Sequence, residues 1–145
     1  MVTNTNVYNE DLETANMEKH EKLLNMLMDF NPLVRFTAVF THDGEIKWSS
    51  KRDDVNTIIP LEETKSSIKR AAESWKARKK RSENGAGRGM YTITAYEKIK
   101  RITIPMDDDH ILFISTNNEP KKKDGYGKLV GMGEIMSIVD FINKN

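Results

Sequence analysis

Residues 34–50, VRFTAVFTHDGEIKWSS, carry the strongest structural signal in this chain of 145 residues. The first eight of them alternate in side-chain character and are rich in β-branched and aromatic types, as is typical of a strand. Asp43-Gly44 is a strong two-residue turn signal, and the alternation resumes after it. The stretch therefore predicts an antiparallel hairpin with strands at 34–41 and 45–50.

Three helices and three more strands are expected around this hairpin. Apolar side chains at three- and four-residue steps predict a helix over residues 10–30, which ends at Asn31-Pro32 because the residue before proline disfavours the helical conformation. The same spacing predicts a second helix from Leu61 onward, with Pro60 before it and acidic residues in its first turn. Alternation predicts three further strands, over residues 91–96, 99–105 and 110–116. Helical spacing predicts a last helix over residues 128–143.

The element order is therefore α-β-β-α-β-β-β-α. Helices and hairpins mix within one short chain and no parallel crossover pattern occurs, so we expect an α+β fold: a five-stranded antiparallel sheet flanked by helices. The strand at 110–116 is the most hydrophobic, which predicts a central place in the sheet. Residues 1–10 are polar and aperiodic, which predicts a flexible tail before a single domain over residues 11–145.

Composition excludes several classes of protein. The chain has no cysteine, which excludes disulfides, thiolate nucleophiles and Cys-ligated metal centres. Its 23 Lys and Arg and 22 Asp and Glu give a net charge of +1, which excludes a uniformly basic nucleic-acid coat. No apolar run is long enough to cross a membrane, and the first ten residues do not have the pattern of a secretory signal. We therefore expect a cytoplasmic protein without a membrane span.

Charge is nevertheless segregated along the chain. Residues 64–90 hold nine Lys or Arg and two Glu, for a net charge of +7, whereas residues 1–21 have a net charge of −4. The candidate phosphate or nucleic-acid contacts are Lys76, Arg78, Lys79, Lys80, Arg81 and Arg88. Such a patch could contact the phosphates of nucleic acid or of anionic lipid headgroups, or it could be only a solvated helix end. Few aromatic residues lie near it, which argues against single-strand readout by base stacking.

The sequence predicts no catalytic, cofactor-binding or metal-binding residue. Three glycines at 85, 87 and 89 follow a helix and precede a strand, whereas a dinucleotide loop follows a strand and precedes a helix. Residues 107–110, DDDH, are expected to form an exposed hairpin turn, because adjacent side chains diverge and cannot together encircle a cation. The three histidines lack zinc-site spacing, and no nucleophile elbow is present.

Two segments carry a resemblance to a known family. The hairpin at 36–50, FTAVFTHDGEIKWSS, resembles the opening hairpin of roadblock / dynein light-chain domains, which belong to the profilin-like and longin-like superfold. Residues 96–115 are similar to the fourth and fifth strands of that family, which pair across a short acidic turn. The resemblance spans residues 11–143 as a pattern of elements, and small archaeal domains share the same layout.

This resemblance implies a non-enzymatic homodimer that acts as a scaffold or regulator for another protein, often a small GTPase. In the family the third strands join edge to edge and the second helices lie side by side. Carried over to this chain, the dimer interface would consist of Tyr91, Ile93 and Ala95 on the strand and Ile68, Ala72 and Trp75 on the helix. The charged segment at 76–89 departs from the family pattern. There are two alternatives to a scaffolding or regulatory function. One is association with nucleic acid, and the other is a PAS-like small-molecule sensor, which has a similar sheet.

Overall fold

The computed structural model describes residues 19–52, 61–81, 85–118 and 132–144. Five strands are present: β1 (Val34–Thr41), β2 (Ile46–Lys51), β3 (Thr92–Ala95), β4 (Ile99–Pro105) and β5 (His110–Asn117). The helices are an N-terminal helix over residues 19–30, α2 (Leu61–Arg81) and α3 (Met132–Lys144). This arrangement confirms the predicted α+β class and element order.

All five strands form one antiparallel sheet in the order β2-β1-β5-β4-β3. Strand β5 is central, as its hydrophobicity predicts, and its residues 111–116 are buried on both faces. Strands β2 and β3 are the two edges. The order follows from the connections: hairpins join β1 to β2, β3 to β4 and β4 to β5, and β1 completes the sheet on the free side of β5.

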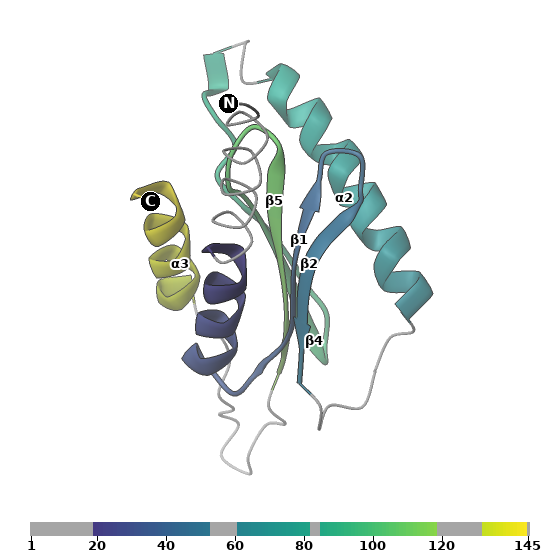
Figure 1. Cartoon of the computed structure of the whole chain (residues 1–145). Helices are drawn as coiled ribbons and strands as arrows, with labels where there is room; N and C mark the ends of the chain where they lie inside the picture. Colours follow the sequence, from purple (N-terminus) through teal and green to yellow (C-terminus); the bar gives the residue numbers. More distant parts are fainter. Residues whose placement is uncertain (1–18, 53–60, 82–84, 119–131, 145) are drawn as a thin grey trace, which may run out of the picture.

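Helices cover both faces of this sheet (Figure 1). The N-terminal helix and α3 lie on one face, and α2 lies on the other. Because side chains alternate along a strand, β1 sends Val39 toward the helix pair and Phe40 toward α2. Beneath the helix pair, the larger core includes Leu24 and Leu27 packed on the sheet, whereas the core beneath α2 is smaller and centres on Phe40 and Phe113.

The β1–β2 turn shows why the glycine of the Asp43-Gly44 signal is needed. Gly44 has a φ of +82°, a conformation that other residues rarely adopt. A Cβ atom there would also lie 2.9 Å from Cγ of Lys69 on α2. The turn therefore approaches α2 closely, and backbone conformation and space both require glycine.

The predicted boundaries differ from the observed ones by one residue at several ends. Strands β1 and β4 match the prediction, whereas β2 is shifted by one residue and β3 is shorter. Strand β3 pairs with β4 from Thr92 opposite Thr103 to Ala95 opposite Lys100, and the Tyr96 amide then donates to the Ile99 carbonyl to close the turn. The predicted tail at 1–10 and the predicted helical residues 10–18 and 128–131 lie outside the described residues.

Candidate functional site

Strand β3 forms one edge of the sheet, and within the described residues it pairs with β4 only. Helix α2 lies over β1 and β5 and reaches β4 through Trp75, whose Nε1 donates to Oγ1 of Thr103 at 2.8 Å. Thr94 and Ala95 are exposed. In the part of the chain that the structure describes, no strand pairs with the outer edge of β3, so this edge can accept an additional strand.

The six residues carried over from the family fall in two environments. Tyr91 and Ile93 are half-buried against the core of the helix pair, and Ala95 is exposed. The three helix residues, Ile68, Ala72 and Trp75, are 0%, 1% and 4% exposed, because they pack against the sheet of their own chain. A second copy could therefore contact α2 only through the residues that face outward.

The candidate basic residues lie at the C-terminal end of α2 and in the segment after it, but several are already engaged. Lys76 Nζ forms an exposed ion pair with Asp43 Oδ1 at 3.1 Å. The Arg78 guanidinium lies over the Trp75 ring, 4.8 Å from its centre, and Arg88 donates to the Asn143 side chain at 3.1 Å. The other members, Lys79, Lys80 and Arg81, are exposed in the last turn of the helix. The basic residues predicted from the sequence therefore do not act as one patch, because Lys76, Arg78 and Arg88 each contact a different side chain.

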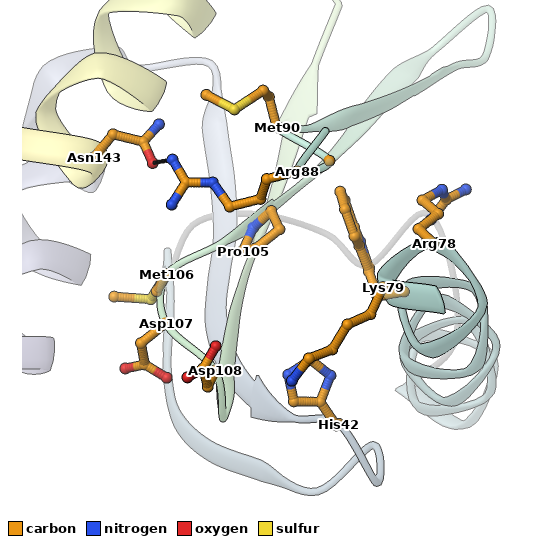
Figure 2. A pocket seen from close by; sticks show the side chains of 12 residues that line it. His42, Arg78, Lys79, Arg88, Met90, Pro105, Met106, Asp107, Asp108 and Asn143 are labelled. Carbon is orange, nitrogen blue, oxygen red and sulfur yellow. Dashed lines mark hydrogen bonds between the residues drawn. The ribbon is translucent and has the colours of Figure 1, made fainter. Parts of the chain in front are cut away.

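A cavity of about 330 Å³ opens at this end of the molecule (Figure 2). Arg88 and Asn143 lie at one end of it, and His42 lies below the Lys79 side chain at the other. Asp107 and Asp108 line the same cavity as the cationic side chains. Charges of both signs therefore line this cavity, so its charge does not favour an anionic ligand over a cationic one.

Gly89 also lines this cavity, and its role was not visible in the sequence. A Cβ atom there would lie 2.7 Å from Cζ3 of Trp75, so the backbone packs directly on the indole ring. By contrast, nothing lies within 4 Å of a Cβ at Gly85 or Gly87, which both have positive φ angles. The glycine-rich segment thus contains one glycine required by packing and two with the positive φ angles that favour glycine.

The acidic turn at 107–110 is closed by its own first side chain. Asp107 Oδ1 accepts hydrogen bonds from the Asp109 amide at 2.7 Å, the His110 amide at 2.8 Å and His110 Nδ1 at 3.0 Å. Burial alone would raise the pKa of Asp107, but these hydrogen bonds and the attraction of His110 outweigh it and lower the pKa. In the part of the chain that the structure describes, no group of three or more His, Asp and Glu side chains could hold a metal ion.

A second groove, of about 220 Å³, runs between α2 and strands β3 and β4. We name it the arginine groove after three of its lining residues, Arg70, Arg78 and Arg101. Hydroxyl groups from both elements also face it, among them those of Ser67, Thr92 and Thr94. No sequence motif pointed to this groove. The available signal was the alternation in β4, which places Arg101 and Thr103 on the face opposite Ile102 and Ile104.

A sheet with this strand order, with two helices on one face and one on the other, defines the structural class. Solved structures with the same arrangement include an MglB described with a tetrameric arrangement (TM-score 0.63, 10% identity, 86% of this chain and 82% of that chain). The gliding protein MglB from Thermus thermophilus is similar over 88% of this chain and 84% of its own (TM-score 0.64, 10% identity). A Roadblock/LC7 domain from Streptomyces avermitilis matches over 84% and 92% (TM-score 0.56, 10% identity).

The chain therefore has the fold of MglB and Roadblock/LC7 domains, as the resemblance of its hairpins implies. No protein-family model matches the sequence, and no curated protein does either. At 10% identity these similarities establish the fold and leave the activity open. None of the helices within the described ranges combines the length and apolar character that crossing a bilayer requires.

Proposed function

We propose that this chain is a non-enzymatic scaffolding or regulatory domain that forms a homodimer through strand β3 and binds another protein. The observation that carries the proposal is the outer edge of β3, which has no further strand paired with it among the described residues and lies beside the groove between α2 and the sheet. A second β3 strand added there would hydrogen-bond to main-chain groups that otherwise face solvent. The family resemblance makes a small GTPase or another signalling protein the partner to test first.

Small side chains on the side of α2 that borders the arginine groove support the same arrangement. Ser67, Ala71 and Ser74 recur at helical spacing and border the sheet surface next to β3. The distance between two packed helices depends on the size of the side chains at the contact, and small ones permit close approach. These residues, rather than the buried stripe of α2, would lie beside the helix of the second copy.

The test is the absolute mass of the full chain by light scattering during size-exclusion chromatography, at low and at high salt. A dimer at micromolar concentration is expected, and Ala95→Lys should make it a folded monomer, because like charges would then face each other across the paired edges. Ser137→Lys is the matched control, since Ser137 is exposed on α3 on the opposite face. A monomeric wild type, or equal effects of the two variants, would contradict the proposal.

Exposed cations in the last turn of α2 support a second candidate function, association with nucleic acid. Lys79, Lys80 and Arg81 all face solvent there. Binding to duplex DNA or RNA should then weaken steeply as salt increases, because phosphate contacts release counterions. Replacing all three with alanine should abolish the binding, and an absence of binding by the wild type at low salt would exclude this function.

A further inference from the structure

Among the described residues, the arginine groove contains a buried charge without a counter-charge. Arg101 is only 8% exposed and lies on β4 beneath α2. Its Nη1 donates to Oγ of Ser67 at 2.9 Å, and its guanidinium carbon lies 5.9 Å from the centre of the Tyr96 ring. Its Nε is buried and has no acceptor in the described part of the chain. A buried guanidinium normally pairs with a carboxylate or another anion, because desolvation of an unpaired charge is costly.

No carboxylate supplies that anion within the described residues. Neither Asp nor Glu lines the arginine groove, and no ion pair there involves its three guanidinium groups. Arg78 lies instead against the Trp75 ring. Nearby, the pKa of Arg35 is lowered, mainly by burial and further by repulsion from Arg101. The positive charge of Arg101 therefore also acts on Arg35, which does not line the groove.

We propose that the arginine groove binds the phosphate group of a small molecule, with Arg101 as its buried anchor. Three arginines and several residues with hydroxyl groups line it, and a phosphate offers more acceptor oxygens and more charge than a carboxylate. The unpartnered Nε–H of Arg101 would donate to one phosphate oxygen. Arg70 is exposed at the mouth of the groove and would supply a second contact. The small volume of about 220 Å³ favours a compact ligand.

All of these residues belong to one chain, but three that line the groove, Ser67, Ala71 and Ser74, also border the proposed dimer contact, so phosphate binding and dimer formation can affect each other. The cation set is also distinct from the basic run at the end of α2. Only Arg78 belongs to both, and Lys79, Lys80 and Arg81 do not line the arginine groove. Phosphate binding here and nucleic-acid binding at the helix end therefore respond to different substitutions.

The test is isothermal titration calorimetry of the full chain. Inorganic phosphate and glycerol phosphate are titrated separately, and sodium chloride keeps the ionic strength constant. We expect saturable binding by the wild type, and the tighter of the two ligands tells whether the site prefers free or esterified phosphate. Arg101→Met should weaken binding by about 10- to 100-fold, since charge-assisted hydrogen bonds are lost. Arg81→Met, on the same helix as Arg70 but outside the groove, is the matched control and should leave the affinity unchanged.

Arg101 also joins β4 to α2 through Ser67, so its replacement could disturb folding as well as binding. Arg70→Met avoids this problem because Arg70 is exposed, and it should also weaken phosphate binding while leaving the circular dichroism spectrum unchanged. The proposal is overturned if neither phosphate ligand binds the wild type. It is equally overturned if Arg70→Met binds phosphate as tightly as the wild type does, since only the control Arg81→Met is expected to do so.

Discussion

Replacing Thr103 with valine should loosen the attachment of α2 to the sheet. The Thr103 hydroxyl accepts the hydrogen bond from the buried indole nitrogen of Trp75 at 2.8 Å and also contacts the hydroxyl of Thr92. Valine keeps nearly the same volume, but it leaves the indole N–H without an acceptor. An unsatisfied buried donor costs about 1–3 kcal/mol, so we expect the free energy of unfolding to fall by about 1–2 kcal/mol once the apolar gain of valine is subtracted.

Urea unfolding followed by circular dichroism measures this change. With a denaturant slope of about 2 kcal/mol per molar, the midpoint should fall by roughly 0.5–1 M. Thr116→Val is a matched control, because Thr116 is also a buried strand threonine but its hydroxyl has no hydrogen-bond partner within the described residues. Removing that hydroxyl should cost nothing or raise stability. Equal losses for the two variants would refute the reasoning, because the effect would then come from the strand and not from the indole hydrogen bond.

Four further substitutions test the packing and the turn chemistry. Gly89→Ala places a methyl group 2.7 Å from the Trp75 ring and should cost about 1–3 kcal/mol in urea unfolding, whereas Gly133→Ala meets open space and should gain about 0.5–1 kcal/mol. Ala72→Lys buries an ammonium group beneath α2, so circular dichroism should show an unfolded chain at any salt concentration. The lowered pKa of Asp107 stabilises the fold above about pH 4, and this contribution is lost as the pH falls through the folded pKa. Asp107→Asn should therefore flatten the decline of the melting temperature in acid, and an unchanged acid profile would refute this account.

Local signals in the sequence account for most of the fold. The alternation in β1 and β4 predicts both strands with their observed bounds, because each is flanked by turn residues that end the pattern. Helix α2 begins at Leu61, where proline and acidic residues predict a start. Strand β3 is less well predicted, since an edge strand ends where its single neighbour stops pairing with it. That end depends on the register with β4, which is a tertiary property.

The candidate site could be predicted only in part, because side-chain periodicity identifies a face but not what covers it. The helical stripe of Ile68, Ala72 and Trp75 indicates burial, and the family resemblance assigned that burial to a second copy. The structure instead packs these side chains on their own sheet. Conversely, Arg101 lies on the polar face of an alternating strand, which on its own suggests a solvated residue. Its burial arises only because α2, far away in sequence, crosses that face.

The two faces of the sheet differ in how they satisfy buried polar groups, and this difference supports the proposed site on the α2 side. The larger core under the helix pair leaves two threonine hydroxyls, of Thr37 and Thr116, without partners among the described residues, which is a modest cost for neutral groups. Under α2 the core is smaller, and among the described residues the unpartnered buried atoms on that side include Nε of the charged side chain of Arg101. Proteins tolerate such a violation mainly where a ligand or partner relieves it. The open edge of β3 borders the same groove, so a phosphate bound to Arg70, Arg78 and Arg101 would also reduce the positive charge facing a second copy. Phosphate should then favour dimers more than sodium chloride does at equal ionic strength.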